Sequence, residues 1–196
     1  GNVSQRVRGA AEDGSQDLLV IKPSGVSYDD LSPEAMVVCD LDGNLVLGEG
    51  SPSSDTAAHA YVYRHMSEVG GVVHTHSTYA TAWAARGEEI PCVLTMMGDE
   101  FGGPVPVGPF ALIGDDSIGR GIVDTLRESR SPAVLMRNHG PFTIGRDARA
   151  AVKAAAMVEE VAKTVHVARA GGPLVPIEQH HIDSLYDRYQ NVYGQH

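Results

Sequence analysis

Short apolar runs separated by turn residues predict a series of β-strands. Residues 18–21, 36–40, 45–47, 72–76 and 133–136 are rich in Val, Leu and Ile, which favour strands. Asp42, Gly43 and Asn44 stand between the second and third runs, so we expect these two strands to form a hairpin. Residues 8–16 are rich in Gly, Ser and charged side chains, which indicates a surface loop between two strands.

Longer segments with capping residues predict helices over residues 57–66, 77–83, 117–127 and 147–170. In the last of these, apolar positions recur at helical spacing, which indicates that it packs against a sheet: Val152, Ala155, Val158, Ala162 and Val165. Strands mixed with helices, some strands joined as hairpins, predict a single α/β domain with a mixed or largely antiparallel sheet. A dinucleotide-binding fold is not favoured, because no Gly-x-Gly-x-x-Gly lies between a strand and a helix.

The charge of the chain bears on its partners. Fifteen Lys and Arg against 25 Asp and Glu give a formal net charge of -10, which argues against broad binding to nucleic acid or to an anionic membrane. A small anion could still be held locally by backbone amides and one lysine. No apolar run is long enough to span a bilayer.

Two cysteines, Cys39 and Cys92, are too few for a disulfide framework, so we expect a reducing, cytoplasmic location. The chain starts at Gly1 rather than at Met, and we expect that N-terminal residues are missing. A targeting peptide in that missing segment remains open.

The histidines are the strongest candidates for chemistry. His74 and His76 lie two apart on a predicted strand, so their side chains project from one face with Cα atoms about 7 Å apart. His139 also follows an apolar strand directly, and three histidines at strand ends are typical of a catalytic metal site. The alternative is a pair of hydrogen-bonded histidines at a sheet rim.

Asp55 could supply a fourth, oxygen ligand, or could simply place a negative charge at a helix N-terminus. His59, one turn further along, is interpreted as a hydrogen-bond partner of Asp55 or as a core histidine. The remaining histidines are expected to be solvated: His65, His166, His180, His181 and His196.

Three segments combine small residues, hydroxyls and free amides in a way that suits an anion: residues 1–4, 22–25 and 51–54. Each of them taken alone would be interpreted as an ordinary turn or helix cap.

Taken together, six segments carry a resemblance to a known family. They are GNVS (residues 1–4), IKPSGVSYDDL (21–31), PSSDTAAH (52–59), GGVVHTHS (70–77), NHGPF (138–142) and VYGQ (192–195). In this order, and spread over nearly the whole chain, they resemble the class II aldolase/epimerase family, with its sugar-phosphate 4-epimerases as the nearest match. The resemblance implies a three-layer α/β/α sandwich with a central, mostly antiparallel sheet, assembled as a cyclic homotetramer with sites between subunits.

The resemblance also implies roles for individual residues. The metal ligands would be His74, His76 and His139 with Asp55 at the fourth position, and the metal would be zinc, for which manganese or cobalt could substitute. Residues in the three small-residue segments match substrate- and phosphate-binding positions: Gly1, Asn2, Lys22, Ser24, Gly25, Ser53 and Ser54. Asp99 aligns with one catalytic acid/base, and Tyr193, reached across the subunit interface, aligns with the other.

The implied reaction inverts C4 of a ketopentose phosphate, converting L-ribulose 5-phosphate into D-xylulose 5-phosphate. Because C4 bears no acidic proton, the C3–C4 bond would break and re-form on the other face of the aldehyde, which requires two acid/base groups.

Two departures from the family pattern bear on substrate preference. Met97 and Gly98 precede Asp99 where the family commonly has His and Ala, and a histidine expected near Leu185 is replaced.

Two alternative functions remain at this point. A class II aldolase would cleave a deoxyketose phosphate, such as L-fuculose 1-phosphate, and release both halves. Such aldolases typically carry Glu at the position of Asp55, so the shorter aspartate favours the epimerase. A non-enzymatic scaffold like the adducin head shares the fold but has lost the metal histidines, which this chain retains.

Overall fold

The computed structural model of the protein describes residues 1–10 and 16–192. Within them the strands form one eight-stranded sheet with the order β4-β3-β2-β1-β5-β8-β7-β6. Every neighbouring pair is antiparallel except β6 with β7. The strands are β1 (Asn2–Val7), β2 (Leu18–Ile21), β3 (Val37–Asp40), β4 (Leu45–Leu47), β5 (Gly71–His74), β6 (Val107–Gly108), β7 (Ala133–Met136) and β8 (Gly140–Gly145).

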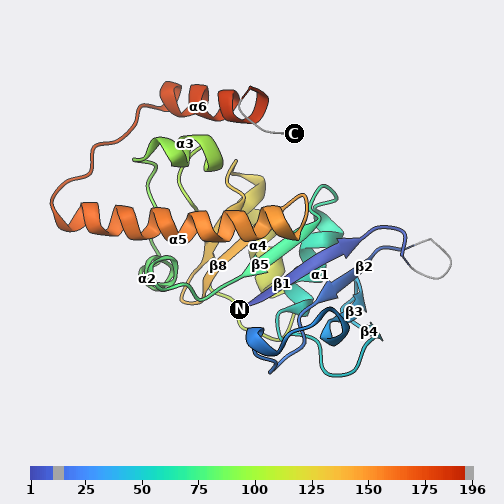
Figure 1. The fold of residues 1–196 in the computed structure, drawn as a ribbon. Coiled ribbons are helices and arrows are strands. Elements are labelled where there is room, and N and C mark those ends of the chain that lie inside the picture. Colours follow the sequence, from blue (N-terminus) through green and yellow to red (C-terminus); the bar gives the residue numbers. More distant parts are fainter. Residues whose placement is uncertain (11–15, 193–196) are drawn as a thin grey trace.

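Helices cover both faces of this sheet (Figure 1). They are α1 (Thr56–His65), α2 (Thr78–Arg86), α3 (Thr95–Phe101), α4 (Ser117–Arg127), α5 (Ala148–Ala170) and α6 (Gln179–Asn191), with short 3-10 helices at Tyr28–Asp30 and Pro33–Ala35. Helices α1 and α4 pack on one face and α2 and α5 on the other, while α3 and α6 lie above α5 in the view of Figure 1. The predicted three-layer sandwich with a mostly antiparallel sheet is therefore confirmed.

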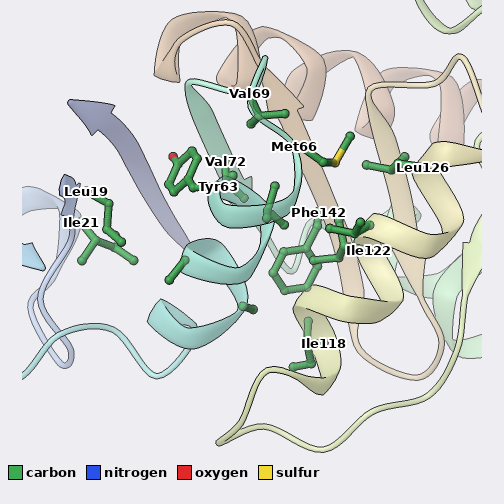
Figure 2. Close-up of a cluster of buried hydrophobic side chains, with 14 of the residues drawn as sticks. Leu19, Ile21, Tyr63, Met66, Val69, Val72, Ile118, Ile122, Leu126 and Phe142 are labelled. Carbon is green, nitrogen blue, oxygen red and sulfur yellow. The ribbon is translucent and has the colours of Figure 1, made fainter. Parts of the chain in front are cut away.

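Each face of the sheet has its own hydrophobic core. Strand β7 shows the division directly, because Val134 and Met136 point into one core and Ala133 and Leu135 into the other. Figure 2 shows the first core, where Tyr63 of α1 and Ile122 of α4 lie among its apolar side chains. Because β7 is buried on both faces, its sequence is a continuous apolar run, and this pattern predicted the strand.

Most predicted elements occur within a residue or two of their expected bounds. Asp147 caps α5 by accepting a hydrogen bond from the amide of Ala150 at 2.7 Å, and Gly87 closes α2 in the left-handed conformation. The loop predicted over residues 8–16 falls between β1 and β2, although residues 11–15 lie outside the described residues. Val152 is wrong as a core position of α5, because it is 47% exposed.

Other differences concern elements that the pattern did not predict. Residues 2–4 form the start of β1 rather than a turn, and Gly140-Pro141 open a strand rather than only ending β7. Helices α3 and α6 were also not predicted. In α6 only Ile182 is buried, so the helix carries a weak apolar signal.

Among the described residues no helix is long and apolar enough to cross a membrane. Cys39 and Cys92 are both buried and do not form a disulfide. The feature that matters most for function is the end of β5. There His74 pairs with Asn2 of β1 on one side and with Phe142 of β8 on the other, so three distant segments meet at one point.

Candidate metal centre

Three histidines converge at the end of β5. His74 is the last residue of that strand, His76 lies just beyond it, and His139 belongs to the tight turn between β7 and β8. One ring nitrogen from each lies within 4.8 Å of the other two. The Nε2 atoms of His74 and His76 are 2.9 Å apart, close enough to share a proton or a cation. A hydrogen-bonded pair would account for two of these rings but not for the third.

The surroundings of His74 fix its ring. Its Nδ1 lies 3.0 Å from the carbonyl oxygen of Pro141, and because a carbonyl can only accept, Nδ1 carries the hydrogen. The ring also stacks on Phe142 with centroids 4.1 Å apart. The Nε2 lone pair is therefore held in one direction, toward the other two histidines.

Close packing of the backbone supports this arrangement. A Cβ at Gly140 would approach the carbonyl oxygen of Thr75 to 2.8 Å, and one at Gly1 would approach the carbonyl oxygen of His74 to 2.7 Å. Neither distance is sterically possible without movement of the backbone, so glycine is needed at both positions. The two glycines let the N-terminal strand and the β7–β8 turn lie directly against the histidine-bearing segment.

Burial favours the neutral form of two of the rings, those of His74 and His139, and this form suits cation binding. Burial lowers the pKa of His74 to about 3, opposed by the hydrogen bond to Pro141. Burial also lowers the pKa of His139, and the carboxylate of Asp55 opposes that shift. A neutral imidazole offers a lone pair, whereas a protonated one repels a metal ion.

Asp55 lies beside this cluster, immediately before α1. Its carboxylate is buried and does not cap the helix through its side chain. Instead Oδ2 accepts a hydrogen bond from Nδ2 of Asn2 at 2.6 Å, while Oδ1 has no partner among the described residues. Three imidazoles are a donor set that fits zinc, and also manganese or cobalt, whereas the carboxylate of Asp55 lies outside the group of ligand atoms within 4.8 Å of one another. We name the four residues His74, His76, His139 and Asp55 the histidine edge.

The three small-residue segments meet around Asp55. Pro23 and Pro52 form an isolated bridge, and the amide of Ser24 donates to the carbonyl of Ser51 at 2.9 Å, so residues 22–25 and 51–54 lie side by side. Asn2 joins the first segment to them through its hydrogen bond to Asp55. Ser24 and Gly25 are exposed, and Gly25 has a φ of +75°, which favours glycine. The ammonium of Lys22 is nearly buried and donates to the carbonyl of Pro23 at 3.1 Å.

Asp99 occupies a different part of the molecule. It lies half-buried on α3, in an open cavity of about 390 Å³ whose other lining residues are Thr95, Leu185, Arg188 and Tyr189. Helix α3 packs on α6, and we name these two helices the α3–α6 end. In Figure 1 this end lies above α5, whereas the N-terminus, which adjoins His74, lies below it. Tyr193 follows α6 and lies outside the described residues.

The two sequence departures prove to be neighbours in space. A Cβ at Gly98 would come within 2.7 Å of Cδ1 of Leu185, so the position before Asp99 packs directly on the position where a histidine was expected. The contact is apolar in this chain.

Some residues near the histidine edge had no strong signal in the sequence. His59 is fully buried, as expected of a core histidine, but its hydrogen-bond partner is Ser4 rather than Asp55. The carboxylate of Glu159 on α5 accepts from the amides of Tyr79 and Ala80 at the start of α2, which anchors the segment that follows His76. Neither pairing could be found from local pattern, because the partners are 55 and about 80 residues apart.

A second group of possible ligands lies at the start of α6. Glu178, His180 and His181 also bring ligand atoms within 4.8 Å of one another, but all three are exposed. The positive end of the helix dipole disfavours a cation there. This group serves below as a control for the buried cluster.

A mostly antiparallel sheet between two helical layers, with three histidines gathered at the end of a central strand, defines a class II aldolase fold. The chain belongs to the class II aldolase and adducin N-terminal domain family, whose sequence model matches residues 1–166.

Similar solved structures extend over most of the chain. An L-fuculose 1-phosphate aldolase is 28% identical with a TM-score of 0.86, covering 96% of this chain and 85% of its own. YgbL from Escherichia coli, for which aldolase, epimerase and decarboxylase are the candidate activities, is 26% identical with a TM-score of 0.78, covering 94% and 86%. An L-fuculose-1-phosphate aldolase from Thermus thermophilus is 26% identical with a TM-score of 0.69, covering 89% and 87%.

Proposed function

We propose that this protein is a metal-dependent sugar-phosphate 4-epimerase that interconverts L-ribulose 5-phosphate and D-xylulose 5-phosphate. The observation that carries the proposal is the convergence of three imidazoles beside a buried aspartate with one open oxygen. The same point is bordered by the segments suited to holding a phosphate.

The histidine edge would hold the metal, with zinc as the expected ion and manganese or cobalt as substitutes. When bound, such an ion supplies Lewis-acid stabilisation of negative charge that develops on substrate oxygens. The chain's own contribution is to keep the ligands fixed and, through burial, to favour the neutral form of His74 and His139. The hydrogen bond from His74 to Pro141 and that from Asn2 to Asp55 each hold one ligand in a single orientation.

The phosphate would bind at the paired segments 22–25 and 51–54, with Gly1 and Asn2 bordering the sugar. Ser24, Gly25, Ser53 and Ser54 present hydroxyls and amides, and Lys22 brings a positive charge into a nearly buried position. Ser54 lies next to Asp55 in the chain, so a phosphate here would place the sugar within reach of the histidine edge.

Proton transfer would be the work of Asp99 and Tyr193. One group removes the proton from the C4 hydroxyl, the C3–C4 bond breaks, and the aldehyde fragment turns before the bond re-forms. The other group then gives a proton to the new C4 oxygen. The resemblance implies that Tyr193 is reached across the subunit interface. Because the α3–α6 end lies across α5 from the N-terminus, we propose that Asp99, too, acts on the histidine edge of a neighbouring copy in a homotetramer.

A class II aldolase is the second candidate, because two of the similar structures are named as L-fuculose 1-phosphate aldolases. The residue that favours the epimerase is Asp55. Its short side chain is buried and tied to Asn2, which suits a ligand better than a base that must reach the substrate. The intact histidine cluster favours either enzyme over an adducin-like scaffold.

The deciding experiment is to incubate the zinc-loaded protein with L-ribulose 5-phosphate and to identify the product by ³¹P and ¹³C NMR. We expect D-xylulose 5-phosphate without accumulation of fragments. Dihydroxyacetone with glycolaldehyde phosphate, or faster cleavage of L-fuculose 1-phosphate, would instead identify an aldolase. The His139→Ala protein is the inactive control, and the His181→Ala protein, which changes an exposed histidine, should remain active.

A further inference from the structure

A line of polar side chains crosses the otherwise apolar contact between β1 and α1. Asp55, His59 and Tyr63 are spaced four apart and face the sheet on one side of the helix. Asn2 and Ser4, two apart on β1, face them. Asn2 bonds to Asp55, and Ser4 Oγ lies 2.7 Å from both His59 Nδ1 and Tyr63 OH. All five residues are at most 6% exposed.

The hydrogen positions in this line of polar side chains can be assigned by counting donors and acceptors. Burial raises the pKa of Tyr63 well above its usual range, so the phenol keeps its proton. If the phenol donates to Ser4, and Ser4 donates to Nδ1 of His59, every hydroxyl hydrogen has an acceptor. In the reverse order Nδ1 would donate to Ser4 and Ser4 to Tyr63, and the buried phenol hydrogen would need another acceptor. The first order leaves only the Nε2 hydrogen of His59 without a partner, whereas the reverse order leaves both the phenol hydrogen and the Nε2 lone pair without one.

This assignment places the hydrogen of His59 on Nε2. The ring is neutral, because burial lowers the pKa of His59 to about 3 against the opposing influence of Asp55, so it carries a single N–H. Nε2 is buried and has no partner among the described residues. Two acceptors in the same line, Oδ1 of Asp55 and Oδ1 of Asn2, also have none.

We infer that His59 is a positioning residue for Asp55, directing its Nε2–H at the Asn2–Asp55 pair through one buried water. A buried donor and two buried acceptors without hydrogen-bond partners each lower the stability of the fold. A water that bridges them across the contact between β1 and α1 would satisfy all three. With Asn2 holding Oδ2 and His59 acting from the next turn of α1, the carboxylate is fixed from two sides. Its open oxygen then keeps a constant direction at the histidine edge. The functional part of this inference rests on the proposed metal centre.

Two matched variants separate this role from mere packing. In His59→Gln the amide nitrogen reaches about as far as Nε2, so a donor toward Asp55 is kept. In His59→Asn the amide reaches only as far as Nδ1, so the contact with Ser4 is kept and the outer donor is lost. Both replace the ring with a buried amide, and thermal unfolding of the metal-free proteins checks that both are folded.

The measurement is the zinc dissociation constant, obtained by competition with a chromophoric chelator in the His181→Ala background, which removes the exposed group. We expect zinc binding to weaken about 10- to 100-fold in His59→Asn, the range found when a residue supporting a ligand is lost. In His59→Gln we expect it to stay within about threefold of the His59 protein. Equal affinities in the two variants would overturn the inference.

A second measurement needs no change at His59. Imidazole ¹⁵N NMR of the metal-free wild-type protein should show His59 as the neutral Nε2–H tautomer, and Ser4→Ala should allow the other tautomer to appear. A hydrogen on Nδ1 in wild type would contradict the assignment. Wild-type protein that binds no zinc would refute the proposed metal centre, whereas the tautomer would still decide the arrangement of His59, so the two failures are distinguishable.

Discussion

The histidine edge and the α3–α6 end are built from different interactions. At the histidine edge, rings and a carboxylate are held by buried hydrogen bonds and by glycines that allow close backbone contact. At the α3–α6 end, an ion-pair network of Lys153, Glu100 and Tyr189 joins α6 to the rest of the chain, and Lys153 remains 55% exposed.

This difference indicates what each region does. A metal ion needs ligands that cannot move, and the histidine edge supplies them within one chain. The aldehyde fragment rotates between bond cleavage and bond formation. The residues that transfer protons therefore need access to both of its faces. The α3–α6 end carries Asp99 in an open cavity, and among the described residues none of the three histidines lines it. We therefore treat the two regions as halves of one site contributed by different copies.

The largest expected effect is the loss of one histidine from the edge. His139→Ala should release the metal and lower kcat/KM by at least about 10³-fold, because the ion supplies several kcal/mol of transition-state stabilisation. The domain should stay folded, since His139 lies in a turn rather than in a core. Zinc content by plasma emission spectrometry and activity after chelation and zinc return are the measurements. Full activity in a metal-free preparation would contradict the role of the histidine edge as a metal site.

An intermediate effect is expected at the phosphate segments. Replacing Ser53 and Ser54 with Ala should raise KM for L-ribulose 5-phosphate about 10- to 100-fold, since charge-assisted hydrogen bonds contribute ~1.5–3 kcal/mol each. KM for unphosphorylated L-ribulose should change little. The exposed Ser67→Ala serves as the matched control. Equal changes for both sugars would place the phosphate elsewhere.

The smallest expected effect is a difference between the two regions in their contribution to the free energy of unfolding. Glu159→Gln removes a charged acceptor from the amides that begin α2 and should lower the free energy of unfolding by about 1–2 kcal/mol. Lys153→Met removes an exposed ion pair and should change it by less than about 1 kcal/mol. Urea unfolding of both variants gives the two values. A larger loss from Lys153→Met would show that the α3–α6 end is held as firmly as the histidine edge.

The sequence alone predicted the elements whose signals are local. Strand alternation predicted that His74 and His76 lie on one side, and their rings do converge, although β5 ends at His74 and His76 lies beyond it. The apolar run of β7 ended just before His139. Asp147 and Gly87 marked helix ends through capping chemistry that needs no distant partner. The resemblance then joined these positions to Asp55, which periodicity had left as either a ligand or a helix-end charge.

What could not be predicted depends on contacts between distant segments. The pairing of Ser4 with His59 follows from the register of β1 against α1, and the hydrogen bond from His74 to Pro141 follows from the pairing of β5 with β8. Helix α3 contains Gly98, a poor helix former, and owes its form to packing on Leu185 of α6. Asp99 and Tyr193 as acid/base groups remain predictions.

The central claim is that the histidine edge of one copy works with the α3–α6 end of another, and a mixing experiment tests it directly. His139→Ala and Asp99→Asn should each be nearly inactive alone, the second with zinc binding unchanged. After both are unfolded together in equal amounts and reassembled, a random ring would contain an intact site at about one quarter of positions. We predict epimerase activity near one quarter of the wild-type value. Well-formed mixed oligomers without recovered activity would contradict the claim, because every site would then draw His139 and Asp99 from the same chain.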